Sequence, residues 1–428
     1  MHRCTRVVEL VTVLVSAVIG GLALATPISL SWARGGSSTV QIELLATNLP
    51  RAAAIGCVGA VVVAVFASTA QSLIVPWLCA LLGMLVLLAN HLLGGSLSSI
   101  APLTSLNYVD SLSGGVLLGG LAAAVSVRLM MTFAFVLGAI ISIVVGQIGE
   151  VTQYIGDTPR GPAAWFIDSP PLWLIWPATV LVIWCALRYR HGRRYATITV
   201  DLPLSPILAA VVGISVPVLG SEWMVRNGTG AMDIVLATAA TLIAVYAAGR
   251  LLPGRDGVLL QLSVAIASVG IIVVPIPLSV WMVPISIIGN ATGLLIGSLR
   301  GSPVAGMLAV LALSAFGALA NNPAHPVPGA ALGGTVVLSV IAGYCFSAAM
   351  PHHSPSLMLG ITVLYVPGVV IALRGRMFTT DPGLTLHNAV PGVTAMVVAL
   401  GCLVNLLILR RRPIVRPDPV VSVAAPGE

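Results

Sequence analysis

An all-α integral membrane protein with 12–14 transmembrane helices is the fold class that this sequence predicts. The first observation behind it is composition: 58% of the 428 residues are hydrophobic, 8% are charged, and the mean hydropathy is +1.05. A soluble domain has about 25% charged residues, so this chain cannot cover a water-facing surface of its size. The second observation is that apolar runs of about 20 residues, the length of a membrane-spanning helix, recur between short turns rich in Gly, Pro and Ser.

Fourteen apolar runs can be counted in order along the chain. They lie near residues 7–27, 51–69, 72–93, 108–127, 130–149, 172–189, 204–221, 232–250, 257–275, 279–298, 303–320, 329–349, 355–373 and 389–409. Two pairs nearly fuse, at residues 68–72 and around Arg128, so counts of thirteen and twelve stay open. Strands are excluded because unpaired backbone groups are costly in lipid, and the runs lack the alternation of barrel strands. The first run resembles a signal peptide, but because many spans follow we expect it to remain as the first helix.

A basic segment at residues 188–203 fixes the expected orientation. It carries Arg188, Arg190, Arg193 and Arg194, and a second cluster, Arg410, Arg411 and Arg412, follows the last run. With a cytoplasmic N-terminus and fourteen crossings, 14 of the 20 arginines face the cytoplasm and 6 face outward. Cytoplasmic loops carry such an excess of positive charge. We therefore expect a multi-pass protein of a bacterial inner membrane, in contact with the lipid bilayer and with both termini cytoplasmic.

Layout and local sequence together resemble a family of transporters. Residues 40–85 and 281–317 look like matching helix pairs of the fourteen-span, drug-antiporter-like branch of the major facilitator superfamily, the second with Gly297, Arg300, Gly301 and Gly306 around its turn. Residues 194–206 resemble the entry into that branch's inserted helix pair. The resemblance implies two six-helix bundles with an inserted pair: a first bundle at 1–187, a basic cytoplasmic linker at 188–203, the pair at 204–255, a second bundle at 256–412, and a disordered cytoplasmic tail at 413–428.

Three departures make the chain a degenerate member of that branch. The family's charged latch turn between spans two and three is the uncharged stretch 67–72 here, and Val18 stands where drug antiporters carry a first-span Asp, nine residues before Pro27. The fifth-span motif is reduced to Gly138, Gly146 and Gly149, without proline. The resemblance therefore does not imply proton coupling.

Polar groups inside the runs are the candidate transport residues, because burying them in lipid is costly. They are Glu9, Arg128, Gln147, Gln261, Asn290 and Asn405. Each has a simpler interpretation: Glu9 would pair with Arg6 at i, i+3, Arg128 would mark a cytoplasmic turn instead of binding an anion, and the amides would join helices. Asp110 and Asp233 are expected to be solvated at outer span ends.

No enzyme, metal site or cofactor is predicted. His352 and His353 are adjacent, so they point different ways, and no Cys or carboxylate is near them in the sequence. Phosphate-binding loops, HExxH and GxSxG are absent, and no basic patch with aromatics suggests nucleic acid.

Two functions stay open. The first is a secondary transporter that exports a lipophilic or weakly polar small molecule by alternating access, because so few charges lie within the spans. The alternative is a non-transporting scaffold or lipid-handling subunit of an envelope or secretion complex. The glycine pairs Gly114–Gly115 and Gly119–Gly120 suit such a partner interface as well as internal packing.

Overall fold

The structure is a computed structural model, and most of the chain is described in it. The described residues are 2–26, 39–97, 102–126, 128–154, 170–192, 204–226, 230–274, 281–320, 329–376 and 390–412. Arg193, Arg194 and the tail 413–428 lie outside these ranges, as does the side chain of Gln147. The described part is helical and holds no β-strand, so the all-α fold class is confirmed.

Six helices form the first half of the molecule. They are α1 (His2–Ala25), α2 (Thr39–Thr69), α3 (Ile74–Leu97), α4 (Leu103–Val125), α5 (Leu129–Tyr154) and α6 (Leu172–Arg188). Within this half α2 packs against α4, α1 against α5, and α3 against α6. Helix α4 also lies against α1 and α3, so it is the centre of the half and has the largest buried share of these helices.

The second half contains the remaining helices. They are α7 (Leu204–Arg226), α8 (Ala231–Leu251), α9 (Gly257–Val273), α10 (Met282–Arg300), α11 (Pro303–Ala320), α12 (Ala330–Ala348), α13 (Ser354–Thr362), the 3-10 turn η3 (Val363–Tyr365), α14 (Val369–Arg376) and α15 (Val390–Arg410). The pairings of the first half recur here: α10 packs against α12, α9 against the broken helix α13–η3–α14, and α11 against α15. Helices α7 and α8 pack against each other outside this repeat.

Each of the fourteen predicted apolar runs contains a helix within the described residues. Among the described helices 12 are long and apolar enough to cross a membrane, and α6 and α9 are shorter apolar helices. Several boundaries differ from the prediction: α2 begins at Thr39 and runs through Pro50, α4 begins at Leu103, α3 and α5 end later, at Leu97 and Tyr154, and the thirteenth run is broken after Thr362. The residue boundaries of the proposed domains stay a prediction.

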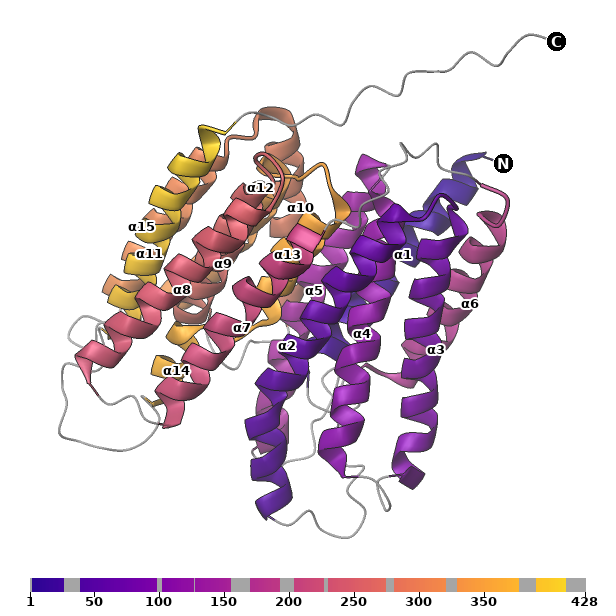
Figure 1. The fold of residues 1–428 in the computed structure, drawn as a ribbon, viewed down its shortest axis with the longest axis horizontal. Coiled ribbons are helices and arrows are strands. Elements are labelled where there is room, and N and C mark those ends of the chain that lie inside the picture. Colours follow the sequence, from indigo (N-terminus) through magenta and orange to yellow (C-terminus); the bar gives the residue numbers. More distant parts are fainter. Residues whose placement is uncertain are drawn as a thin grey trace.

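Arginines mark one end of the helix bundle, which we call the arginine end. Helix α1 begins there and α15 ends there (Figure 1), and Arg128, Arg188, Arg250 and Arg410 lie in the turns or last turns of helices at this end. The other end of the bundle is called the opposite end. Which of the two faces the cytoplasm stays a prediction from charge.

The four paired glycines of α4 are used inside the molecule. A Cβ on Gly114 would lie 2.6 Å from the carbonyl oxygen of Gly20 in α1, and one on Gly120 would lie 2.5 Å from the backbone nitrogen of Ala80 in α3. Gly115 and Gly119 meet backbone carbonyls of α2 in the same way. These glycines let three helices approach the α4 backbone closely. The side of α4 that each glycine presents is therefore already covered by a helix of the same chain.

The two halves meet along several helices. Helix α2 contacts α13 and α7, and α5 contacts α10, so in Figure 1 α7 and α13 lie between the two groups of helices. Cys57 of α2 donates to the carbonyl oxygen of Thr362 at 3.4 Å. Towards the opposite end Arg51 of α2 binds both carboxylate oxygens of Glu222 in α7 at 2.8 Å.

Candidate functional site

A cavity of about 340 Å³ lies between the two halves. Its walls come from α1, α2 and α5 on one side and from α9, α10, α12 and residues 364–371 on the other. The lining residues lie between the middle of the bundle and the opposite end, as Ala25 in the last turn of α1 and Ser286 in the first turns of α10 show. This volume is within the range of small-molecule sites.

The cavity wall is mainly apolar and has no charged residue among its described lining. Its polar side chains come from the second half: Ser286 and Asn290 of α10, Thr335 and Ser339 of α12, and Tyr365 of η3. A charged ligand would have no counter-ion among the described lining residues, and leaving a charge unpaired away from water is costly. The arrangement suits an uncharged and mostly apolar molecule.

Two of the polar groups in this wall have unused hydrogen-bonding capacity. The Asn290 amide donates from Nδ2 to the carbonyl oxygen of Ser286 at 2.8 Å, but its Oδ1 has no partner among the described residues, and neither has the Ser286 hydroxyl. Both side chains are almost fully buried. Unpaired buried acceptors are uncommon and call for a partner, so a ligand with an N–H or O–H group fits this wall.

Tyr365 joins the two halves beside the cavity. Its hydroxyl lies 2.8 Å from Ser142 Oγ and donates to the carbonyl oxygen of Ala139 at 2.9 Å, both in α5. Gly21 of α1 faces this contact, and a Cβ there would overlap Ser142 Oγ and the tyrosine hydroxyl. The side of the cavity nearer the arginine end is therefore tied across the halves by side-chain hydrogen bonds.

A buried carboxylate, Glu9 of α1, organises the arginine end of the first half. Its oxygens bind Arg128 Nη1 at 3.0 Å, Arg188 Nε at 2.9 Å and the Tyr189 hydroxyl at 3.0 Å. The two guanidinium groups are about half exposed, whereas the Glu9 side chain is 1% exposed. These partners join α1 to the α4–α5 turn and to the end of α6.

The partner expected for Glu9 was therefore wrong. The guanidinium groups that reach it belong to Arg128 and Arg188, which are distant in sequence, and not to Arg6. Arg128 itself lies in the turn between α4 and α5 with its side chain 53% exposed, not deep in a helix. Neither residue lines the cavity.

Two of the other candidates hydrogen-bond between helices away from the cavity. Gln261 of α9 donates to the carbonyl oxygen of Val245 in α8 at 3.0 Å, and Asn405 of α15 donates to Gln261 Oε1 at 3.4 Å. Of the described transport candidates, Asn290 alone lies in the cavity wall. Asp233 accepts from the backbone N–H of Gly230 at the start of α8.

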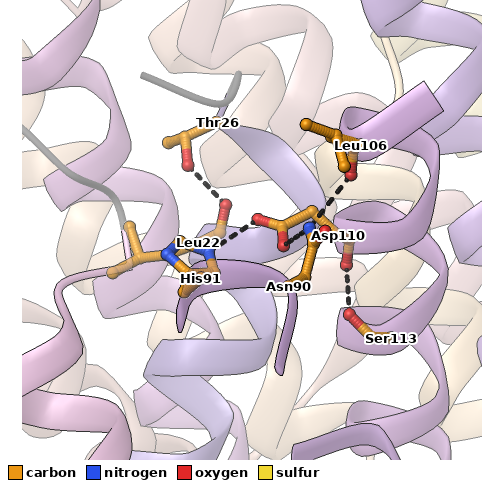
Figure 2. Close-up of polar contacts among 7 residues, drawn as sticks. All are labelled: Leu22, Thr26, Asn90, His91, Leu106, Asp110 and Ser113. Carbon is orange, nitrogen blue, oxygen red and sulfur yellow. Dashed lines mark hydrogen bonds and ion pairs between the residues drawn. The ribbon is translucent and has the colours of Figure 1, made fainter. Parts of the chain in front are cut away.

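Asp110 contradicts the expectation of a solvated span end. It is 0% exposed and lies inside α4, which begins seven residues earlier than Asp110 and not two. Asn90 and His91 of α3 bind its two oxygens, Asn90 Nδ2 at 2.8 Å from Oδ1 and His91 Nε2 at 3.0 Å from Oδ2 (Figure 2). Sequence reasoning missed this cluster, although Asn90 and His91 interrupt an apolar run and mark it.

A second cavity and a carboxylate lie at the arginine end of the second half. The cavity, of about 310 Å³, lies between Ser126, Leu129 and Thr132 of the first half and residues 350–354 and 357 of the second. Beside it Asp256, in the α8–α9 turn, accepts from the backbone N–H groups of His352 and His353 and lies 2.9 Å from His353 Nδ1. The hydrogen bond to Asp256 raises the pKa of His353.

This turn-to-turn contact is expected to depend on pH. Because the folded-state pKa of His353 is raised, its stabilising contribution is full below the unfolded value of about 6.5 and is lost as pH rises through the folded-state value. His353→Gln should therefore lower the melting temperature more at pH 5.5 than at pH 8.5. The difference in unfolding free energy between the two pH values should be roughly 0.5 kcal/mol, because the ring is partly exposed and solvent weakens the interaction. The check is thermal unfolding at both pH values. His352→Gln, whose ring nitrogen is 4.0 Å from Asp256, is the matched control and should show a smaller pH difference.

Comparison with known proteins gives similar folds at low identity. No family model and no curated protein matches the sequence. The chain is similar to a structure of the major facilitator superfamily proton:xylose symporter XylE bound to 6-bromo-6-deoxy-D-glucose, at 13% identity and a TM-score of 0.49, over 94% of this chain and 95% of that one. It is similar to a partially occluded inward-open xylose transporter XylE from E. coli (12%, 0.46, 92% and 96%) and to an auto-inhibited POT family peptide transporter (12%, 0.43, 96% and 98%). A likeness of this kind concerns the course of the helices and does not identify a cargo.

Proposed function

We propose that this protein is a secondary transporter that exports an uncharged, mostly apolar small molecule by alternating access. The observation that carries the proposal is the cavity of about 340 Å³ whose walls come from both halves. A site between two halves with repeated helix pairings is where rocking of one half against the other exposes a cargo first to one side and then to the other. The apolar wall and the unpaired acceptor of Asn290 favour a cargo with one N–H or O–H donor.

The finer parts of the proposal rest on the sequence. The inserted pair α7–α8 and the resemblance of three stretches support membership of the fourteen-span branch of the major facilitator superfamily. The charge asymmetry supports a bacterial inner membrane with both termini in the cytoplasm. Export, as opposed to uptake, follows from the drug-antiporter-like character of that resemblance.

The rival function, a non-transporting scaffold, has less support from the geometry. The glycine pairs of α4 that suited a partner interface pack against α1, α2 and α3 within the chain. A cavity with polar groups between the halves counts against a scaffold, because a scaffold needs no ligand site.

Filling the cavity is expected to abolish transport. Ala267 of α9 lines the cavity and is partly exposed to it, so Ala267→Phe places a ring in the cargo volume. The probe is N-phenyl-1-naphthylamine, an uncharged fluorescent molecule with one N–H donor, in proteoliposomes of phosphatidylethanolamine and phosphatidylglycerol. Flux should fall by at least about tenfold, which corresponds to roughly 1.4 kcal/mol of lost cargo binding. The control Ala240→Phe, on an exposed position of α8, should transport as the native chain does. Equal flux in both variants, or none in the native chain, would contradict the proposal.

Removing the unpaired acceptor should affect only cargo that donates a hydrogen bond. Asn290→Leu keeps the approximate volume of the side chain and deletes Oδ1. The apparent affinity for N-phenyl-1-naphthylamine should fall by about fivefold to tenfold, because a hydrogen bond in a buried site contributes about 1 kcal/mol. The N-methyl derivative, which has no donor, should bind both proteins alike. A similar loss for both probes would show that Asn290 acts on the shape of the cavity instead.

A further inference from the structure

A smaller cavity, which we call the side pocket, lies next to the cavity of about 340 Å³, here called the cargo cavity. The side pocket has a volume of about 40 Å³, and its walls come from α7, α8, α9 and α15 and from residues 363, 366 and 368–370. Both helices of the extra pair take part, α7 with Gly213 and Pro217 and α8 with Thr241. The helix pair that lies outside the repeated pairings of the two halves therefore reaches the neighbourhood of the cargo cavity.

Three residues lie between the side pocket and the cargo cavity. Ala267 and Ile271 of α9 and Val366, at the end of η3, line both cavities. Ala267 and Ile271 are only partly buried. In the stretch that follows η3, Pro367 lines the cargo cavity, whereas residues 368–370 line the side pocket. The partition between the two cavities is therefore one residue thick, and its side chains are aliphatic.

The side pocket suits an alkyl group better than water. Its described lining has no charged residue, and its polar side chains are Thr241 and Ser268. Each of these hydroxyls donates its proton within its own helix, to the carbonyl oxygens of Ala237 and Val264 at 2.9 Å. A buried water needs two to four polar partners, whereas an alkyl group needs none. A volume of about 40 Å³ holds roughly three groups of the size of a water molecule, which is the length of a propyl chain.

We propose that the side pocket binds a short alkyl branch of the cargo and thereby selects the cargo by the length of that branch. The cargo is then an uncharged molecule with three parts. An apolar body fills the cargo cavity, one N–H or O–H group reaches Asn290, and a branch of about three carbon atoms passes between Ile271 and Val366 towards α7 and α8. The inference rests on the proposed function, because the ligand is taken to be the cargo, but binding of the branch is measured without transport.

A series of N-alkyl-1-naphthylamines tests the length of the branch. Each member has one N–H donor and is uncharged at neutral pH. Equilibrium dialysis of the full-length protein in lipid nanodiscs, with empty nanodiscs as background, gives a dissociation constant relative to free probe in water. From N-methyl to N-propyl this constant should fall by about tenfold to fifteenfold, because each buried methylene contributes about fourfold. N-hexyl should bind no more tightly than N-propyl, and an affinity that rises at the same rate through N-hexyl overturns the proposed pocket.

Two variants change the side pocket at residues that do not line the cargo cavity. Gly368 has no positive φ, and a Cβ there would meet no atom within 4 Å, so Gly368→Val occupies free space and should bind N-propyl and N-methyl about equally. Val398 of α15 is 2% exposed, so Val398→Ala enlarges the side pocket, and N-pentyl should then bind about tenfold more tightly than N-propyl. The control Gly333→Val, at an exposed position of α12 with equally free space around its Cβ, should keep the native order of the series.

The outcomes separate this inference from the proposed function. If the native order of the series persists in both Gly368→Val and Val398→Ala, the branch does not bind in the side pocket, and absence of binding of every member to the native protein overturns the inference as well. Flux of the same probes is measured in proteoliposomes. A preference for N-propyl in binding without any flux overturns transport and leaves the side pocket in place. Flux and binding that are equal for N-methyl and N-propyl overturn the side pocket and leave transport in place.

Discussion

Gly115→Val is expected to unfold the first half of the protein or to destabilise it at the upper end of about 1–3 kcal/mol, the usual cost of overpacking. A Cβ at this position would overlap the carbonyl oxygen of Gly56, and the Gly56 carbonyl carbon would lie 2.9 Å away. These are backbone atoms, so no side-chain rotation can relieve the overlap. Helices α2 and α4 would have to separate along their shared face.

The measurement is unfolding in detergent followed by circular dichroism, compared between two valine variants. Gly220 of α7 has no atom within 4 Å of its added Cβ, so Gly220→Val should be neutral or slightly stabilising, because Gly is the less favourable residue in a helix interior. Gly115→Ala should fall between the two. If Gly115→Val and Gly220→Val unfold alike, the close contact of α2 and α4 is wrong.

The second large effect is expected from leaving Glu9 without its arginines. The double variant Arg128→Ala, Arg188→Ala keeps a carboxylate that is 1% exposed and leaves it only the Tyr189 hydroxyl among its described partners. Removing the partners of a buried charge costs about 3–5 kcal/mol. The double variant should therefore lose much of the stability of the first half.

A third substitution distinguishes buried charge from lost packing. Adding Glu9→Gln to the double variant removes the unpaired charge and keeps the volume, so it should recover part of the stability, about 1–3 kcal/mol. In the native background the same Glu9→Gln should be destabilising. Unfolding by increasing dodecyl sulfate measures all four proteins. If Glu9→Gln changes the stability in the same direction in both backgrounds, the interaction between these residues does not depend on charge.

The helices could be predicted from sequence because composition decides them. Continuous runs of about 20 apolar residues without alternation are stable in lipid as helices, and each of the fourteen contains a described helix, the thirteenth of them broken after Thr362. The positions of the helix ends were predicted less well, and the start of α4 changed the interpretation of Asp110. A start at residue 108 puts Asp110 at the water boundary, whereas the start at Leu103 puts it roughly 10 Å along the helix axis.

The site could be predicted only in part, because contacts between distant residues decide it. Arg6 was the local choice for Glu9, but Arg128 is 119 residues away from it, and no periodicity brings the two together. Asn290 and Gln261 look alike in sequence, as lone amides in apolar runs. Because of the way α10 packs, Asn290 lies in the cavity wall, whereas Gln261 of α9 donates a hydrogen bond to α8.

The interruption between η3 and α14 has a mechanical meaning. The chain leaves the helix at Val366, lines the cavity at Val366 and Pro367, and resumes after Gly368 as α14 at Val369. Helix α14 packs against α7 of the extra pair as well as against α9. Part of the cavity wall is therefore carried by a short helix, which residues 366–368 separate from the preceding helix and which α7 covers on another side. The main contacts of α14 are with α7, α8, α9 and α15, all in the second half, so its position depends on packing within that half.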